Sequence, residues 1–366
     1  MYLNTIVPFM DLSRFYKQYE KQILDITRSI YESGRFMDGA FVDHCEHKLS
    51  EIYNYPETVL VNSCTDALFF ALQTAGIKPG DEVIITSFSF IASLTPILRA
   101  GAIPVFVDID PDTCLMDYEE IPSKINSKTR AILAVHLYGQ VLDMKKINAI
   151  AESHSLIVIE DAAQSIGIIP NYGNAKKSEF ICLSFDPTKV VHAFGSGGAV
   201  VCNNKYSGEI KQLRHHGRQN KEYVILGYNS RISEQQAALL LFQLNMLDTL
   251  ISERKSIAKT YLSLLSNTTQ IQLPDIKTDT NFHKFVVQTE ERDKLKNHLL
   301  SNGINCMIHY EKALNEHKVL SPIYNEISLP NTQRMTKKVL SLPIFFQMNF
   351  GEIEKVCKII RDYFSG

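Results

Sequence analysis

Two stretches of the sequence decide the fold: LIVIEDAAQ at Leu156–Gln164 and FICLSFDPTK at Phe180–Lys189. Each begins with a short run of large apolar residues, which has the length of a buried strand. Each then changes to polar and turn-forming residues, so reactive side chains follow both strands directly. Because parallel strands end at the same edge of a sheet, we expect the two polar segments to lie close together.

The same alternation of short apolar runs and helical patterns extends on both sides, from about Val59 to Val201. It predicts an α/β fold with a large, mostly parallel sheet that helices cover. The expected strands are Glu82–Thr86, Pro104–Asp108, Ala131–His136, Leu156–Glu160, Phe180–Phe185 and Ala199–Asn203. The expected helices are Thr65–Thr74, Ser89–Arg99 and Ser233–Leu264, where apolar residues recur at helical spacing.

The composition becomes polar at Ser266–Asn281, which is typical of a boundary between domains. We therefore expect a large α/β domain with an N-terminal arm at residues 1–265 and a small α+β domain at residues 266–366. The small domain is expected to close over a site on the large one. Its expected elements are strands at Phe285–Thr289 and Asn305–His309 and helices at Asp293–Asn302 and Glu352–Tyr363.

The overall composition argues against several classes of protein. The 366 residues include 38 Lys and Arg against 40 Asp and Glu, a net charge of −2, so a basic nucleic-acid-binding surface is not expected. No apolar run approaches the ~18 residues of a membrane span, and the first residues lack a signal-peptide pattern. The seven cysteines are scattered, which indicates reduced thiols rather than disulfides or zinc ligands. The sequence predicts a cytoplasmic protein that binds neither nucleic acid nor membrane.

Familiar nucleotide and hydrolase motifs are absent from the sequence. Neither GxxxxGK[ST] nor GxSxG occurs. The glycines at 195, 197 and 198 also fail the dinucleotide fingerprint, because Val200 stands where a third glycine is needed. A nicotinamide-dependent enzyme and an α/β-hydrolase are therefore disfavoured.

The most informative pair is Asp161 and Lys189, one at the end of each quoted strand. A lysine amine can form a Schiff base with pyridoxal 5'-phosphate (PLP), and a carboxylate can keep the pyridine nitrogen protonated. The protonated ring then withdraws electrons from the bound substrate. The two residues together favour a PLP site.

Ordered motifs along nearly the whole chain carry a resemblance to a known family. They are PFMDL at Pro8–Leu12, GDEVI at Gly80–Ile84, SFSF at Ser87–Phe90, GAIPVFVD at Gly101–Asp108, HLYGQ at His136–Gln140, EDAAQ at Glu160–Gln164, PTK at Pro187–Lys189, GYNSR at Gly227–Arg231 and HY at His309–Tyr310. With these motifs the chain resembles the sugar aminotransferases of the DegT/DnrJ/EryC1/StrS family. The resemblance implies a PLP-dependent transferase of fold type I.

The resemblance also implies roles for three residues at the centre of the site. Lys189 would hold the cofactor and act as the base that moves the proton in the 1,3-prototropic shift. Asp161 would pair with the pyridinium nitrogen, and Gln164 would bind the phenolic oxygen of the ring. Lys189 and Asp161 are thus the expected catalytic residues.

Further cofactor contacts are implied around this centre. The phosphate of PLP, or of its pyridoxamine form (PMP), would lie at the start of the helix that Thr65 and Asp66 open, and Ser184 would add a hydroxyl. Phe90 would stack on the ring. Asn229 would reach in from a neighbouring subunit, so we expect a homodimer with shared active sites.

The implied reaction transfers an amino group from L-glutamate to a keto group of a nucleotide-linked keto-deoxyhexose, as in polysaccharide or lipopolysaccharide biosynthesis. We favour C3, because Phe185–Lys189, Asn229–Arg231 and Glu234–Ala238 are similar to segments of members that aminate C3. The alternative is C4 of a 4-keto-6-deoxy sugar nucleotide, since one lysine serves either carbon and the pose of the hexose decides. The expected sugar contacts are Asp186, Phe194, His309 and Tyr310.

A function of a different class would require different residues. A catalytically silent regulatory or binding protein with the same fold would lack the lysine or the acid, and both are present here. His44 and His47 lie three residues apart on an expected helix and have no evident third ligand, so no metal site is expected. The segment from His215 to Arg218 either contacts a diphosphate or is a solvated basic patch.

Overall fold

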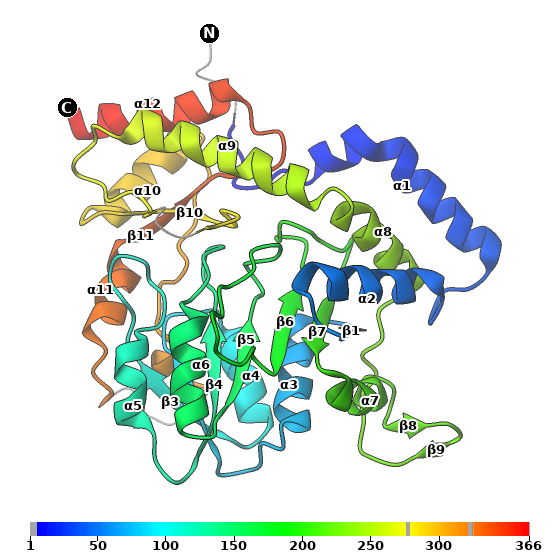
Figure 1. The fold of residues 1–366 in the computed structure, drawn as a ribbon. Helices are drawn as coiled ribbons and strands as arrows, with labels where there is room; N and C mark the ends of the chain where they lie inside the picture. Colours follow the sequence, from blue (N-terminus) through cyan, green and yellow to red (C-terminus); the bar gives the residue numbers. More distant parts are fainter. Residues whose placement is uncertain (1–5, 276–278, 321–323, 325, 366) are drawn as a thin grey trace.

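The computed structural model describes residues 6–275, 279–320, 324 and 326–365. At its centre is a seven-stranded sheet in the order β1-β7-β6-β5-β4-β2-β3 (Figure 1). The strands are β1 (Glu57–Val61), β2 (Glu82–Thr86), β3 (Ile103–Val107), β4 (Thr129–Val135), β5 (Ile157–Asp161), β6 (Phe180–Ser184) and β7 (Gly198–Cys202). Neighbouring strands from β3 to β6 are parallel, whereas β7 runs antiparallel to β6 and β1. The predicted mostly parallel sheet is confirmed.

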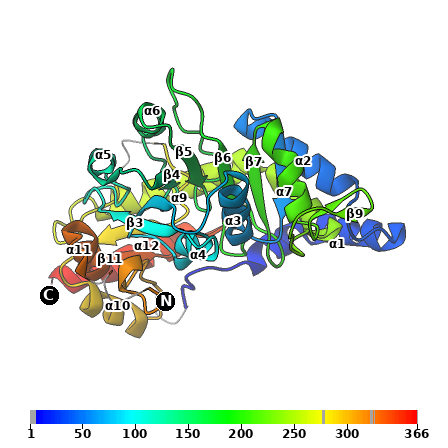
Figure 2. The same cartoon turned by 90° about the horizontal axis from the view of Figure 1, so that it is seen from below.

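Helices bury both faces of this sheet. On β2, Val83 and Ile85 pack with α3 (Cys64–Thr74) and α4 (Ile91–Arg99), whereas Ile84 packs with α6 (Met144–Ser153) on the other face. Figure 2 shows α6 and the short α5 (Ile121–Lys124) on one side of the sheet and α3 and α4 on the other. Because both faces are buried, the strands are continuous apolar runs in the sequence.

The helix expected at Ser233–Leu264 is two helices, α8 (Glu234–Leu244) and α9 (Leu247–Leu265). The chain leaves helical geometry at Met246, with φ −111° and ψ 10°. α8 packs with α2 (Ala40–Tyr53) beside β6 and β7, and the first turns of α9 belong to the same core through Leu247, Leu250 and Ile251. From Ile257 onwards α9 packs into the core of the C-terminal part of the chain, so this helix connects the two cores.

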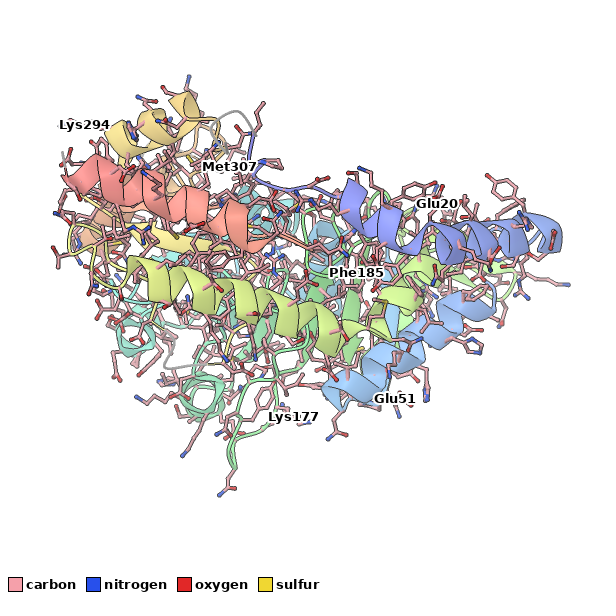
Figure 3. The ribbon with its side chains drawn as sticks, turned by 90° about the horizontal axis from the view of Figure 1, so that it is seen from above. Glu20, Glu51, Lys177, Phe185, Lys294 and Met307 are labelled. Carbon is pink, nitrogen blue, oxygen red and sulfur yellow. The ribbon has the colours of Figure 1, made fainter. Side chains whose placement is uncertain are left out.

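The C-terminal part is built around a two-stranded antiparallel sheet of β10 (Phe285–Gln288) and β11 (Val339–Leu342). Its core also contains residues of α9, α10 (Arg292–Ser301) and α12 (Phe350–Ser365), and Figure 3 shows α9 and α12 side by side. The strand expected at Asn305–His309 does not form. Ile304 makes an isolated bridge to Val7, and Met307 makes one to Ser341. The backbone hydrogen bonds of this segment are therefore divided between two partners and do not form one ladder.

The remaining elements were not predicted from the sequence as such, apart from a helix around His44 and His47 that corresponds to α2. They include β1 at one edge of the sheet and the long helix α1, which projects from the body in Figure 1. Their bounds are α1 (Ser13–Ser33), α7 (Asn204–Leu213), α11 (Pro330–Lys338), and a projecting hairpin of β8 (Arg218–Gln219) and β9 (Glu222–Tyr223).

Two global features bear on the environment of the protein. In the described part of the chain, no helix combines the length and apolar character that crossing a membrane requires. All seven cysteines are buried and free.

Candidate active site

A cavity of about 940 Å³ opens at the edge of the sheet where β4, β5 and β6 end. His136, Asp161 and Ser184 lie at these three strand ends and line it. This is the edge at which open α/β sheets usually bind ligands. Most of the predicted site residues line the cavity: Thr65, Phe90, Asp161, Gln164, Ser184, Asp186, Lys189, His309 and Tyr310.

The carboxylate of Asp161 is 4% exposed and is held by hydrogen bonds from neighbouring segments. Its Oδ2 accepts from the Ser93 hydroxyl at 2.6 Å, and its Oδ1 accepts from the Ala163 amide at 3.2 Å. Because the only hydroxyl proton of Ser93 goes to Asp161, Ser93 accepts in turn from the Ser89 hydroxyl at 2.8 Å. This chain of donors fixes the orientation of the carboxylate at the cavity wall.

A second buried carboxylate, Glu160, lies next to Asp161 along β5 and makes a separate network. It accepts hydrogen bonds from His136 Nε2 at 2.8 Å and from the Tyr172 hydroxyl at 2.7 Å. The Leu142 amide donates to His136 Nδ1 at 3.2 Å, which requires the ring proton to be on Nε2. The network therefore fixes His136 where it borders the cavity.

Lys189 follows β6 in a turn that Asp186 builds. The Asp186 carbonyl accepts from the Lys189 amide at 2.9 Å, and Asp186 Oδ1 accepts from the amide and hydroxyl of Thr188 at 2.9 and 2.6 Å. Lys189 is half-buried and lines the cavity, and its side chain ends in a primary amine. Burial lowers the pKa of that amine, although the nearby Cys64, Asp161 and Asp186 oppose the shift. A lowered pKa favours the neutral, nucleophilic form of the amine.

The start of α3 borders the cavity through Ser63, Cys64 and Thr65. Ser63 caps the helix by accepting from the Asp66 amide at 3.1 Å, and the free amides of the first turn attract anions. Gly198 of β7 packs against this turn so tightly that a Cβ there would lie 2.3 Å from the Ser63 carbonyl carbon. A glycine at 198 is therefore what lets β7 approach the start of α3.

Aromatic side chains form the opposite wall of the cavity. Phe90 is 55% exposed and stacks on Tyr310, with ring centroids 6.1 Å apart. Gln164 connects this wall to the sheet, because its Nε2 donates to the Tyr310 hydroxyl at 3.2 Å and its Oε1 accepts from the Tyr138 amide at 2.9 Å. Burial lowers the pKa of His309, the next residue along the wall, to about 3, so its imidazole is neutral at physiological pH.

Three predicted site residues lie outside the lining of this cavity. The Asp66 carboxylate is bound by the Ser230 hydroxyl at 2.8 Å and by Arg99 at 3.0 Å. Phe194 is 39% exposed and does not border the cavity. Asn229 is exposed and does not line the cavity within one chain.

The histidines outside this cavity show no arrangement of their own for a ligand. His47 lies 3.1 Å from Glu51 on α2. Within the described ranges, no group of three His, Cys, Asp or Glu side chains is arranged to hold a metal ion. His215 makes a backbone bridge to Asn229, and Arg218 donates to the Asn220 carbonyl at 2.7 Å within the hairpin.

A sequence model of the DegT/DnrJ/EryC1/StrS aminotransferase family matches residues 17–361. The chain belongs to this family. It is accordingly a PLP-dependent aminotransferase of fold type I, as the sequence predicted.

Individual members of the family resemble the chain along almost its full length. A pleiotropic regulatory protein of Geobacillus stearothermophilus is 37% identical, with 98% of both chains covered. The dTDP-3-amino-3,4,6-trideoxy-alpha-D-glucose transaminase of Streptomyces venezuelae is 36% identical, with 98% of this chain and 96% of the relative covered. The crystal structure of ntda from Bacillus subtilis with bound cofactor PMP superposes with a TM-score of 0.91 at 27% identity, covering 100% of this chain and 86% of the other.

The side chains of this family member fit the cofactor. Lys189 supplies a buried amine with a lowered pKa, and Asp161 supplies a fixed carboxylate at the end of the neighbouring strand. The first turn of α3 offers free backbone amides that suit an anion, and the absence of a side chain at Gly198 leaves the close approach of β7 to this turn possible. Amine, carboxylate and anion site border one cavity, which is the donor set that the aldehyde, the ring nitrogen and the phosphate of PLP require.

Sequence reasoning missed two parts of the site. Ser93 holds Asp161 from α4, a contact that depends on how α4 packs and leaves no mark in the sequence. Lys284 and His283 reach the cavity from the segment before β10. The sequence signal for them was weak: a lysine directly before an apolar strand is usually a solvated residue.

Proposed function

We propose that this aminotransferase moves the amino group of L-glutamate to the C3 keto group of a nucleotide-linked keto-deoxyhexose. The observation that carries the proposal is the convergence of Lys189 and Asp161 in one cavity of about 940 Å³, which has room for a sugar beside the cofactor. The relative that makes a 3-amino sugar supports C3. Seven free cysteines suit a reducing compartment, which supports the cytoplasm as the location.

In this mechanism each residue of the chain has a defined task. When bound, the cofactor supplies an aldehyde that takes up the amino group and a ring that stabilises negative charge. Lys189 Nζ would hold the cofactor at its aldehyde carbon and would act as the base that takes the proton from the α-carbon of the donor and delivers it to that cofactor carbon. Asp161 holds the proton on the ring nitrogen. Phe90, which lines the cavity, would stack on the ring of the cofactor.

The remaining proposed contacts of the cofactor and the sugar use other residues that line the cavity. Thr65, Ser184 and the first turn of α3 bind the phosphate, and Gln164 binds the ring oxygen. For the sugar, His309 offers a neutral imidazole whose Nδ1 already pairs with Ser341 at 2.8 Å, which leaves Nε2 for a hydroxyl. The hexose pose that these contacts impose decides between C3 and C4.

The decisive experiment separates the two half-reactions. Holoenzyme mixed with L-glutamate should lose the visible absorbance of the bound cofactor, and a 3-keto sugar nucleotide should restore it. Lys189→Ala should bind the cofactor noncovalently and turn over neither substrate. Normal turnover by this variant would overturn the assignment of Lys189. Turnover of 4-keto-6-deoxy sugar nucleotides alone would move the proposal to C4.

A regulatory protein without catalysis is the second candidate, because a relative at 37% identity is named a pleiotropic regulatory protein. The presence of both Lys189 and Asp161 in the cavity favours the enzyme. If purified protein binds PLP but no amino donor changes its absorbance, the regulatory function is the better one.

We also propose a homodimer in which Asn229 completes the site of the other subunit. Subunit complementation tests this arrangement. Lys189→Ala and Asn229→Ala homodimers should each be inactive or weak, whereas a mixture refolded together should regain activity, because one of the two sites in each heterodimer carries both native residues. A mixture no more active than its components would refute the shared site.

A further inference from the structure

A second amine borders the main cavity. Lys284 lies directly before β10, and its amide donates to the Tyr138 carbonyl at 3.3 Å, which anchors the backbone. The side chain is only 8% exposed, and Nζ lies 4.9 Å from the centre of the Phe9 ring. Phe9 belongs to the N-terminal segment that also lines the cavity. Lys284 therefore presents a nearly buried cation at the cavity wall.

This cation has no ionic or hydrogen-bond partner for Nζ among the residues that the structure describes. The charged groups that affect its pKa are Lys189, Arg254 and Asp186, and Asp112 and Asp275 line a smaller pocket that Lys284 also borders. Two of the first three are positive, and Asp186 is exposed with one carboxylate oxygen engaged by Thr188. Within the part of the chain that the structure describes, no carboxylate therefore pairs directly with the Lys284 amine.

Arg254, the other cation near Lys284, does not line the main cavity. Its guanidinium is buried and donates to the carbonyls of Phe282, His283 and Ile344 at 3.0, 2.8 and 3.2 Å. These bonds hold the segment that carries Lys284 and engage Nε and Nη2 of Arg254. Burial and the positive charge of Lys189 lower the pKa of Lys284 to about 7, which expresses the cost of an amine with no anion beside it. A bound anion would offset that cost.

The amino donor supplies such an anion. In an α-amino acid the carboxylate is attached to the carbon that carries the transferred amine, so it must lie within a few ångström of the amine that reacts at Lys189. Resting on the proposed function, we propose that Lys284 binds the α-carboxylate of the amino donor. Lys284 is then a specificity-determining residue: it selects an α-amino acid over a simple amine.

Other anions of the substrates fit this position less well. The diphosphate of a sugar nucleotide is separated from the reacting C3 by the hexose ring, whereas Lys284 lines the same cavity as Lys189, and the charge of Lys189 contributes to the lowered pKa of Lys284. An acidic sugar also carries a carboxylate, and it is the alternative source that the experiment must distinguish. If Lys284 did no more than contact Phe9, its role would be structural.

The test is a cycle of two changes, one in the enzyme and one in the donor. Holoenzyme and Lys284→Gln are compared with L-glutamate and with 4-aminobutyrate, which is glutamate without its α-carboxylate. The measured quantities are the apparent Kd and the limiting rate of cofactor bleaching in single turnovers. Lys294→Gln, an exposed lysine on α10, is the matched control.

A charge-assisted hydrogen bond predicts that Lys284→Gln weakens glutamate binding about 10- to 100-fold. The same variant should change 4-aminobutyrate binding less than about threefold, because that donor lacks the group that Lys284 binds. Lys294→Gln should match the wild type with both donors. If Lys284→Gln weakens both donors equally, or neither, the proposal is wrong, and equal weakening with a lowered Tm identifies a structural role.

Two further arms keep the result separate from the proposed function. Regeneration of the cofactor by a neutral keto sugar should be unchanged in Lys284→Gln, whereas a defect limited to an acidic keto sugar would overturn the donor assignment. If no amino donor bleaches the cofactor at all, the proposed function fails by itself. In that case calorimetry with L-glutamate as a ligand of the holoenzyme still tests Lys284: loss of binding in Lys284→Gln supports the contact, and unchanged binding refutes it.

Discussion

Gly198→Ala should dismantle the anion site at the start of α3. The added Cβ would lie 2.3 Å from the Ser63 carbonyl carbon and 2.5 Å from the Cys64 nitrogen, well inside the 3.4 Å at which ordinary contact begins. Both neighbours are backbone atoms, so no side-chain rotation relieves the contact, and β7 must separate from α3. Overpacking of this kind costs about 1–3 kcal/mol. If the displacement falls on the phosphate site, PLP affinity drops about 5- to 150-fold.

The assay is titration of apoprotein with PLP, together with thermal unfolding of the apoprotein. Gly208→Ala is the matched control, because a Cβ at Gly208 of α7 meets no atom within 4 Å. It should leave PLP affinity unchanged and stabilise the helix by about 1 kcal/mol. A Gly198→Ala protein that loses stability but keeps its PLP affinity would refute the assignment of the phosphate to this turn. A Gly198→Ala protein that keeps both its stability and its PLP affinity would show that β7 and α3 are not rigidly packed.

Three further predictions concern groups that support the site or the fold. Ser93→Ala should weaken PLP binding about tenfold, because it removes the 2.6 Å hydrogen bond to Asp161. The control is Thr95→Val, which removes a hydroxyl that donates to the Ile91 carbonyl. This variant should change PLP affinity less than about twofold in the same titration. Apo Lys284→Gln should be more stable than the wild-type apoprotein at pH 7, and this difference should shrink towards pH 9. The pKa of Lys284 is about 7 in the folded chain and 10.5 in the unfolded chain, so the unfolded state binds more protons between these pH values. The stability of the wild type therefore rises with pH in this range, by up to about 1.4 kcal/mol per pH unit. A constant difference in Tm would contradict this. Glu234→Gln should lower stability by about 2 kcal/mol in urea denaturation, because the buried carboxylate accepts from the amides of Gly39, Phe41 and Val42 at the start of α2, and the exposed Glu209→Gln serves as the control.

The sequence predicted the parts of the site that depend on strand ends. Asp161, Ser184 and Lys189 follow short apolar runs, and a parallel sheet brings the ends of such runs together regardless of loop geometry. Lys284 was missed because its burial depends on the N-terminal segment, whose Phe9 covers it from a distant part of the sequence. Such a contact follows from tertiary packing, which a local pattern does not contain.

The differences elsewhere in the fold also have local physical causes. The sequence did not predict the helix break at Met246. Apolar residues recur at helical spacing both before the break, in α8, and after it, in α9, so the sequence pattern does not change at the bend. The sequence did not predict β1, because short apolar runs like this one also occur beside helices. Its partner strand β7 is distant in the sequence, so no local pattern indicates the pairing. The division into domains at residue 266 stays a prediction, and the C-terminal core also includes Ile257 and Tyr261 of α9.

The pairing of β1 with β7 has a consequence for synthesis in the cell. β1 ends at Val61 and β7 begins at Gly198, so about 140 further residues must leave the ribosome before β1 can form its hydrogen bonds. At translation speeds of about 5–20 residues per second, this interval is about 7–30 s. During it the nascent chain carries an apolar strand, Thr58–Val61, with open backbone groups and no partner. We therefore expect newly made chains to depend on protection by ribosome-associated chaperones, and faster translation of residues 62–197 to shorten that dependence.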